Sequence, residues 1–142
     1  MWLNQRTIDA IRLMLELARL WPDRTRAVDL PESTGITIMN IQKTIHALAL
    51  AGLLETQRGR SGGVRLARQP AAIDIGEIVR ALEPTDCPVG FFAQSPSDAV
   101  ISRLLFKAHR GFFQPLEGAT LADLLTAGTA PGPLSREALP VR

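Results

Sequence analysis

The stretch from residue 35 to residue 70 constrains the fold of this 142-residue chain most, because it joins an amphipathic helix to a glycine-rich hairpin. Gly35 suits a tight turn, and the hydroxyl of Thr37 can cap a helix that begins near Ile38. Apolar side chains then recur at steps of three and four residues, which predicts one buried stripe: Ile38, Ile41, Ile45 and Leu48. The opposite faces hold Met39, Asn40, Gln42, Lys43 and His46.

A β-hairpin is expected directly after this helix, which ends at Gly52. Residues 53–57 and 64–67 have the pattern of two short strands, with Leu54 on the same side as Val64 or Leu66. Glycines at the tip allow backbone angles that other residues resist, and its arginines could meet a negatively charged backbone. The tip consists of Arg58, Gly59, Arg60, Ser61, Gly62 and Gly63.

The hairpin is strongly basic, with four arginines and no acidic residue from 58 to 68. A basic hairpin can be simply a solvated surface turn. Its position directly after a helix-turn-helix pattern favours contact with nucleic acid instead.

Several segments resemble the Rrf-two (Rrf2) family of bacterial winged-helix regulators, over roughly residues 1–127. After the helix-turn-helix they read A-G-L at 51–53, R-G-R-S-G-G-V-R-L-A at 58–67, E-I-V-R-A-L-E at 77–83 and T-L-A-D-L-L at 120–125. The resemblance implies a mainly α fold with a small β-hairpin, in which a winged helix-turn-helix is followed by a long C-terminal dimerisation helix. It also implies a dimeric, cytoplasmic transcription factor that places its third helix in the major groove and its wing in the minor groove of double-stranded DNA.

The expected DNA-binding residues come from the recognition helix and the wing. We expect Arg58 and Arg60 to meet phosphates or a narrow minor groove, whereas the helix faces base edges. The full set is Thr37, Met39, Asn40, Gln42, Lys43, Arg58, Gly59, Arg60, Ser61, Gly62 and Gly63.

Charge and composition agree with a DNA-binding first half. Residues 1–70 hold ten Lys or Arg against six Asp or Glu, whereas residues 71–142 hold six against eight. We expect a DNA-binding domain at 1–83, a loop and dimerisation helix at 84–127, and a disordered tail at 128–142. No charge-free run reaches membrane-spanning length, and Arg6 and Asp9 lie where a secretory signal would be apolar, so we expect a cytoplasmic protein with no membrane partner.

The remaining helices are predicted at residues 6–21, 27–34, 73–82, 95–114 and 120–125. The first is apolar nearly all round, which indicates burial against a partner subunit or, alternatively, a central place in a monomer core. Pro31 shortens the second, for which Asp29 is the expected N-cap and Glu32 its capping-box partner.

The helix at 95–114 is capped by Ser95 and carries more apolar surface than a peripheral helix can bury alone. The family resemblance places dimerisation here. The expected dimerisation residues are Ile101, Leu104, Leu105, Ala108 and Phe112, with Phe106 and Phe113 widening the face.

The sequence favours neither an enzyme nor a metal site. It shows no nucleophile motif or Walker-type phosphate loop, and His46, His109 and Cys87 are its only histidines and cysteine. Cluster-bearing relatives in the family offer three cysteines in the loop before the dimerisation helix, so we expect no iron-sulfur cluster and no other cofactor. Cys87 remains an ordinary loop thiol, a redox sensor or a residual metal ligand.

These observations predict a dimeric, sequence-specific transcriptional regulator, a repressor, that senses an unidentified effector through the loop and dimerisation region. Two alternatives are a winged-helix module that binds only proteins and a redox- or metal-sensing regulator that uses Cys87. The protein-binding module would not require a cationic wing, whereas this wing carries four arginines.

Overall fold

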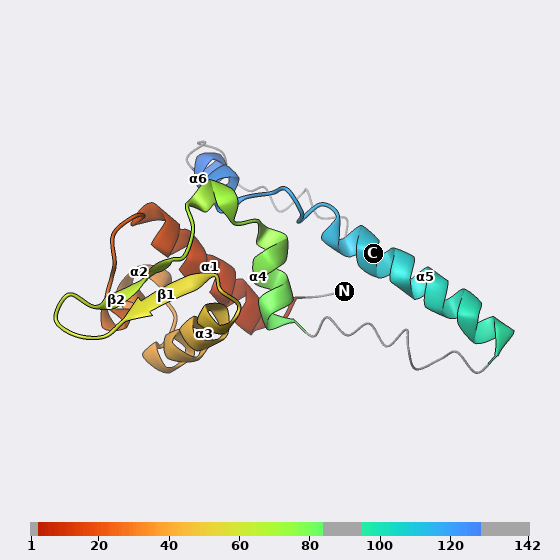
Figure 1. Cartoon of the computed structure of the whole chain (residues 1–142), viewed down its shortest axis with the longest axis horizontal. Coiled ribbons are helices and arrows are strands. Elements are labelled where there is room, and N and C mark those ends of the chain that lie inside the picture. Colours follow the sequence, from red (N-terminus) through yellow and green to blue (C-terminus); the bar gives the residue numbers. More distant parts are fainter. Residues whose placement is uncertain (1–2, 84–94, 129–142) are drawn as a thin grey trace.

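A computed structural model describes residues 3–83 and 95–128 (Figure 1). The predicted fold class is confirmed, because the described residues form mainly helices together with one small antiparallel hairpin. In chain order the elements are α1 (Gln5–Arg19), the 3-10 turn η1 (Ala27–Asp29), α2 (Leu30–Thr34), α3 (Ile38–Leu50), β1 (Leu54–Gln57), β2 (Gly63–Leu66), the 3-10 turn η2 (Pro70–Ala72), α4 (Ile75–Leu82), α5 (Pro96–Phe113) and α6 (Leu121–Gly128).

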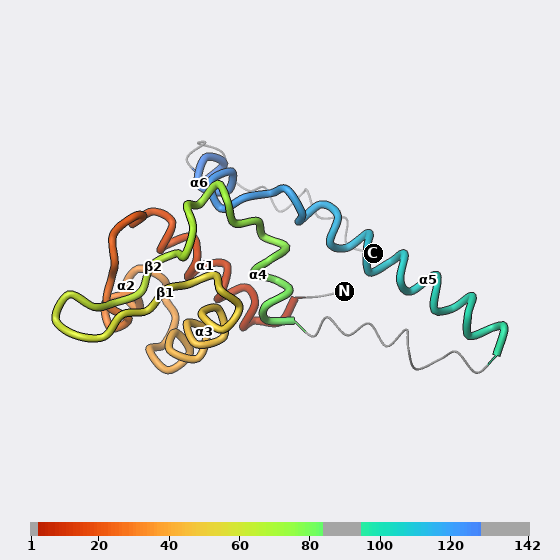
Figure 2. Tube along the Cα trace, in the orientation of Figure 1, coloured from red at the N-terminus to blue at the C-terminus, as the bar shows by residue number. Residues whose placement is uncertain are grey.

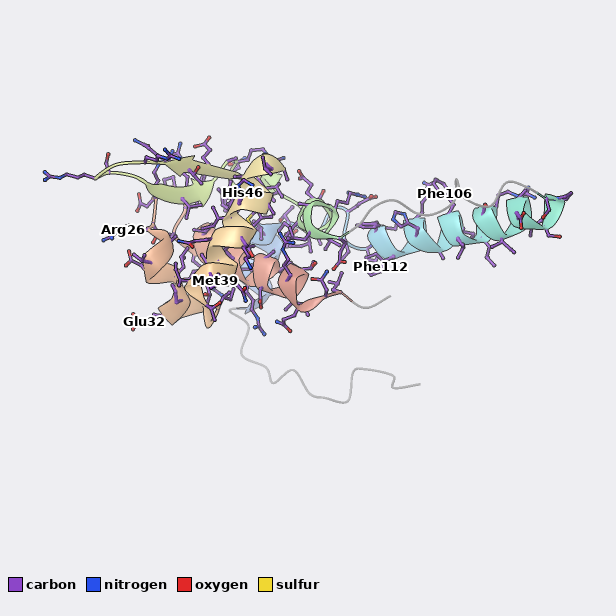
Figure 3. All side chains as sticks on the ribbon, turned by 90° about the horizontal axis from the view of Figure 1, so that it is seen from below. Arg26, Glu32, Met39, His46, Phe106 and Phe112 are labelled. Carbon is purple, nitrogen blue, oxygen red and sulfur yellow. The ribbon has the colours of Figure 1, made fainter. Side chains whose placement is uncertain are left out.

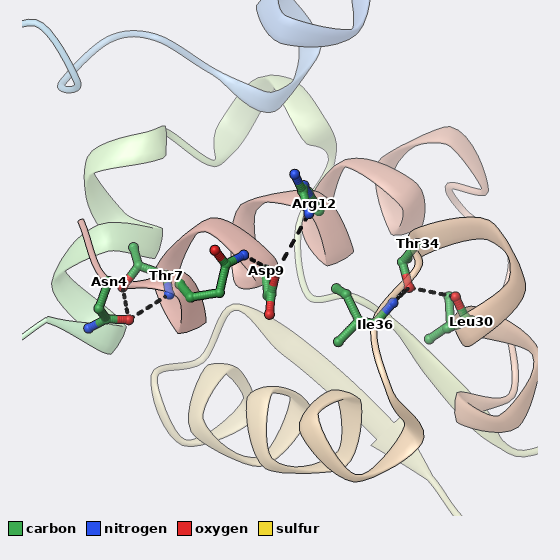
Figure 4. Close-up of polar contacts among 8 residues, drawn as sticks. Asn4, Thr7, Asp9, Arg12, Leu30, Thr34 and Ile36 are labelled. Carbon is green, nitrogen blue, oxygen red and sulfur yellow. Dashed lines mark hydrogen bonds and ion pairs between the residues drawn. The ribbon is translucent and has the colours of Figure 1, made fainter. Parts of the chain in front are cut away.

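Helix α1 lies at the centre of the fold and packs against α2, α3, α4, α6 and β2. Its N-cap is Asn4, whose side-chain oxygen accepts a hydrogen bond from the Thr7 backbone N–H at 3.0 Å (Figure 4). Its buried apolar residues are Ala10, Leu13, Met14, Leu17 and Ala18. Leu20, although apolar like its neighbours, is exposed beyond the end of the helix.

Helix α2 begins differently from the sequence prediction. Asp29 occupies the N-cap position, but it has helical backbone angles and makes no side-chain cap hydrogen bond. The reason is that η1 runs directly into α2, so the N-cap is not in the extended conformation that side-chain capping uses. Pro31 lies in the first turn, as predicted, and Gly35 ends the helix with a φ of +71°.

The turn between α2 and α3 is closed by Thr34. Its hydroxyl donates to the Leu30 carbonyl at 2.6 Å and accepts from the Ile36 N–H at 3.3 Å (Figure 4). Ile36 is buried, so the turn is fixed to the core on the apolar side. This arrangement sets the direction in which α3 leaves the turn.

The two strands pair as the sequence predicted. Leu54 lies opposite Leu66 and Thr56 lies opposite Val64, so the three apolar side chains share the buried face. Helix α4 follows, and its N-cap Asp74 forms a full capping box with Glu77.

The chain returns to this core after α5. The Ile75 N–H donates to the Ala119 carbonyl at 2.8 Å, and the Leu121 N–H donates to the Ile73 carbonyl at 3.0 Å. Helix α6 therefore packs beside α1 and η2, as the tube in Figure 2 shows. The expected tail begins at Gly128, the last residue of α6, and its other residues lie outside the described part of the chain.

Helix α5 projects away from the rest of the fold (Figures 1 and 2). Ser95 caps it through a 3.2 Å hydrogen bond from the Asp98 N–H, as predicted. Phe113, at its last turn, is buried and lies beneath the Arg80 guanidinium, 4.6 Å from the ring centroid. The last turn of this helix is thus anchored on α4.

Candidate nucleic-acid interface

Helix α3 presents one buried face and one exposed face. Ile41, Thr44, Ile45 and Leu48 are buried, which fixes the helix on the core. Ile38 departs from the predicted stripe, since 37% of it is exposed in the first turn beyond the edge of the core. Thr37 caps the helix by accepting a 3.4 Å hydrogen bond from the Asn40 N–H.

The predicted base-facing residues all lie on the exposed face of α3. Met39 is 62% exposed and is labelled in Figure 3; Asn40, Gln42 and Lys43 are also exposed. His46, which was not among the predicted DNA-binding residues, is exposed on the same face. The side chains available to a groove are therefore amides, a cation, an imidazole and a thioether. Such groups can read donors, acceptors and methyl groups on base edges.

The wing tip depends on its glycines. Gly59 and Gly63 have φ angles of +103° and +144°, a region that L side chains rarely adopt. At Gly62 an added Cβ would lie 2.3 Å from the Gln57 carbonyl oxygen. The Gly62 N–H donates to the Gly59 carbonyl at 3.0 Å, which closes the turn.

The base of the wing is docked on the segment before α2. Thr25 and Val64 exchange two backbone hydrogen bonds, of 3.0 and 2.8 Å, and form an isolated antiparallel bridge. An added Cβ at Gly63 would lie 2.5 Å from the Thr25 carbonyl oxygen, so only glycine permits this approach. The wing is thus held by a third segment in addition to its own two strands.

Two of the four wing arginines are already paired with carboxylates. Arg65 lies 2.9 Å from Glu55, which Arg24 also contacts at 3.3 Å, and Arg68 lies 2.5 Å from Glu77. The sequence predicted four available cations in the wing, because residues 58–68 contain no acidic residue. That prediction was wrong, since the pairing carboxylates, Glu55 and Glu77, lie outside this range. Among the described residues, Arg58 and Arg60 have no ion-pair partner, so they are the wing cations available to an anion.

Two further cations lie near these predicted residues, and sequence reasoning missed both. Arg26 lines a cleft of about 540 Å³ against the wing tip. Arg6, at the start of α1, lines another of about 470 Å³ together with Asn40 and Lys43 of α3. No local motif marks either arginine, since each meets its neighbours only in the folded chain.

The start of α1 is tied to the end of α4 by Glu83. One carboxylate oxygen accepts hydrogen bonds from the Asn4 N–H at 3.0 Å and the Thr7 hydroxyl at 2.6 Å; the other accepts from the Asn4 amide at 3.0 Å. Thr7 is fully buried. Glu83 therefore positions the N-terminal end of α1, which carries Arg6 next to α3.

The predicted dimerisation residues lie on the projecting helix α5. Val100, Ile101, Leu104, Leu105 and Phe106 are each between 40 and 66% exposed. Ala108 is exposed and Phe112 is half-buried. The described part of the chain therefore leaves most of this apolar face uncovered.

The donor set for a metal is sparse. Cys87 lies outside the described residues, and within residues 3–83 and 95–128 no group of three or more His, Cys, Asp and Glu side chains could hold a metal ion. Iron-sulfur clusters are held mainly by thiolates, and the whole sequence has one. The residues of this chain therefore do not fit a cluster held by the cysteines of a single subunit. Among the helices described, none is long and apolar enough to cross a membrane.

Comparisons with known proteins agree with this geometry. A family model named Rrf2 and described as an iron-dependent transcriptional regulator matches residues 3–127. The HTH-type transcriptional regulator NsrR of Geobacillus kaustophilus (strain HTA426) is 36% identical over 132 residues, covering 88% of this chain and 90% of that protein. Protein aau3 of Rhizobium meliloti (strain 1021) is 30% identical over 133 residues, covering 89% and 86%.

Solved structures show the same fold. CymR (YrzC) of B. subtilis, the global cysteine regulator, aligns with a TM-score of 0.72 and 23% identity, covering 89% of this chain and 98% of that one. IscR of T. potens aligns with a TM-score of 0.68 and 26% identity, covering 93% and 94%. These alignments cover most of the chain, so the arrangement of α3, the wing and α5 belongs to a fold that is already known.

Proposed function

The chain belongs to the Rrf2 family of transcriptional regulators, and on that premise we propose that it acts in the cytoplasm as a homodimeric repressor of an inverted-repeat operator. It is a DNA-binding transcriptional regulator and not an enzyme. The observation that best supports the proposed binding mode is that Arg58 and Arg60, which have no ion-pair partner among the described residues, lie at the tip of a wing that directly follows α3 and its exposed polar face.

The role of each cation follows from its surroundings. Arg58 and Arg60 contact phosphates or the minor groove, since nothing in the described residues neutralises them. Asn40, Gln42 and Lys43 face base edges in the major groove and select the sequence. Arg65 and Arg68 instead brace the wing through Glu55 and Glu77.

The proposed dimer rests on the apolar face of α5. A surface with five large apolar side chains that are each at least 40% exposed is unusual on a monomer and marks an interaction site. A second copy is the simplest occupant, because a two-fold axis also duplicates the recognition helix. Two such helices read half-sites about one helical turn apart, which requires an inverted repeat.

We also propose that the protein senses its effector without a conventional iron-sulfur cluster. A four-ligand site would have to recruit histidines, carboxylates or the second subunit's Cys87, and no regular spacing in the sequence favours any of these. The signal then acts through the loop and dimerisation region as a small molecule or a protein partner, rather than through oxidation of Cys87. Protein purified without oxygen should be colourless, with negligible iron and sulfide.

The Cys87→Ser variant tests the role of this residue in sensing. It should bind operator like the parent and still respond to the signal, because an ordinary loop thiol contributes to neither. A brown preparation with stoichiometric iron that the substitution abolishes would contradict the proposal.

The DNA-binding proposal is tested by selecting bound sequences with the purified protein and then measuring affinity against salt. Arg58→Ala/Arg60→Ala should make the negative slope of log K against log salt shallower by about 1.8, since each lost phosphate contact accounts for about 0.9. The matched control is Arg65→Ala/Arg68→Ala, which removes the same charge from paired positions and should change the slope less. Equal slopes for the wing variant and the parent at ~0.05–0.2 M salt would refute the assignment.

The recognition helix is tested separately. Asn40→Ala or Lys43→Ala should change which sites are selected, because base contacts carry the sequence information. If both variants selected the same sequence as the parent, the proposal that α3 recognises bases would be wrong.

A further inference from the structure

We propose that the cleft between the wing tip and the start of η1 holds one phosphate of the DNA backbone, with Arg26 and Arg60 as its two cations. The cleft is lined by Arg26, Ala27, Val28, Gly59, Arg60, Gly62 and Gly63 and has a volume of about 540 Å³. The inference rests on the proposed DNA-binding mode and adds to it a contact from outside the recognition helix and the wing.

The two walls of the cleft are fixed relative to each other. Arg26 directly follows Thr25, whose backbone is hydrogen-bonded to Val64 at 3.0 and 2.8 Å. Gly63 permits this contact, because any Cβ there would collide with the Thr25 carbonyl oxygen. The segment of Arg26 and the base of the wing therefore keep their separation before DNA arrives.

The charge of the cleft favours an anion. Its lining contains two arginines and neither Asp nor Glu. Arg26 is exposed and has no ion-pair partner among the described residues, whereas Arg24, two positions earlier, pairs with Glu55 at 3.3 Å. A cation left free beside a carboxylate-paired neighbour is available to an external phosphate.

The glycines leave room for that phosphate. Three of the seven lining residues lack a side chain, so the wall on the wing side is largely backbone. Figure 3 shows Arg26 on the segment before α2, at the same end of the molecule as the wing. A DNA strand that lies against the wing passes this arginine, which makes a backbone phosphate the expected occupant.

The first experiment compares Arg26→Gln with the parent on a selected operator. Loss of one phosphate contact should lower the salt slope by about 0.9, which corresponds to roughly fivefold weaker binding at 0.15 M salt and roughly fifteenfold at 0.05 M. Arg26→Lys should largely restore the slope, because it keeps the charge. Arg24→Gln is the matched control, and its slope should equal that of the parent, since Arg24 is already paired with Glu55.

The second experiment locates the phosphate. In each operator variant a single phosphate is replaced by a neutral methylphosphonate. The parent protein should bind more weakly wherever the replaced phosphate is one that it contacts. Arg26→Gln and Arg60→Gln should both become insensitive to replacement at the same phosphate of each half-site. Identical profiles for Arg26→Gln and the parent would overturn the inference.

The outcomes separate this inference from the proposal on which it rests. If the parent binds no duplex, both fall. If the parent binds with a steep salt slope that Arg26→Gln leaves unchanged, only the phosphate cleft falls. Inorganic phosphate that binds the DNA-free parent at millimolar concentration but not Arg26→Gln, together with identical methylphosphonate profiles for the two proteins, would assign the cleft to a free anion and overturn its assignment to DNA.

Discussion

Replacing Glu83 should destabilise the protein by an amount that its three hydrogen bonds define. Glu83→Ala removes the acceptor for the Asn4 N–H and the Asn4 amide, and it leaves the buried Thr7 hydroxyl with the longer 3.3 Å hydrogen bond to the Asn4 side-chain oxygen. Hydrogen bonds to a charged group contribute about 1.5–3 kcal/mol when protected, but the two from Asn4 are exposed, and water replaces much of what they lose. We therefore expect a loss of about 2 kcal/mol, most of it from Thr7.

The Glu83→Gln variant separates charge from geometry. Its carbonyl oxygen can still accept from the Thr7 hydroxyl and the Asn4 N–H, but its NH₂ group then faces the Asn4 NH₂ group. Asn4 resists a flip, because its oxygen caps α1 through the Thr7 N–H. We expect the free energy of unfolding to fall by about 1 kcal/mol, which places Glu83→Gln between the parent and Glu83→Ala in stability.

Urea unfolding followed by circular dichroism measures both losses, with the denaturant slope m unchanged. Thr7→Val is the control, because valine has the shape of threonine without the hydroxyl. Its combination with Glu83→Ala should be less destabilising than the two single losses added, by at least 0.5 kcal/mol. Additive effects, or a Glu83→Ala loss below about 0.5 kcal/mol, would refute the role given to this carboxylate.

Three other predictions follow from different parts of the structure. Leu105→Asp on the exposed face of α5 should turn a dimer into a monomer in light scattering at micromolar concentration, and a monomeric parent would remove the idea. Gly63→Ala should cost about 1–3 kcal/mol and also weaken DNA binding, because it undocks the wing, whereas Gly118→Ala, with a φ of +92° and open space around it, should affect stability alone. Hydrogen bonds from the Thr120 N–H and hydroxyl hold the pKa of Asp123 below its ordinary value of 3.8. The contribution of Asp123 to stability is therefore present above that pH and is lost as pH falls through the lowered pKa. In urea unfolding midpoints measured from pH 5 downward, Asp123→Asn should remove this loss of stability at acid pH.

Local signals predicted the features that depend on neighbours in the sequence. Thr37 and Ser95 were both identified as caps, and each accepts a hydrogen bond from a backbone N–H three residues later. The hairpin and its apolar face were also predicted, since glycine placement and alternation fix the turn and the register. Asp29 failed as a side-chain cap because the preceding 3-10 turn changed its backbone angles.

Features that join distant segments could not be predicted. Glu55 pairs with Arg65 across the hairpin and Glu77 of α4 pairs with Arg68, and these two pairings reduce the available wing cations from four to two. Glu55 also contacts Arg24, which is 31 residues away. The cleft at Arg26 depends on the bridge between Thr25 and Val64, for which the sequence carries no motif. The DNA-binding roles of the α3 residues remain predictions, although all of the side chains proposed to read bases lie on one exposed face.

The bridge between Thr25 and Val64 also bears on how tightly the wing can bind. Fixing the backbone of one residue costs about 1–2 kcal/mol of conformational entropy, and a hairpin that is mobile in the free protein would lose that freedom in the complex. Here two backbone hydrogen bonds hold the base of the wing before any DNA is present. The tip, residues 58–62, lies beyond the last strand pair and is closed by the hydrogen bond between Gly62 and Gly59. The entropy cost is thus borne mainly during folding, and more of the interaction between Arg58, Arg60 and DNA contributes to affinity.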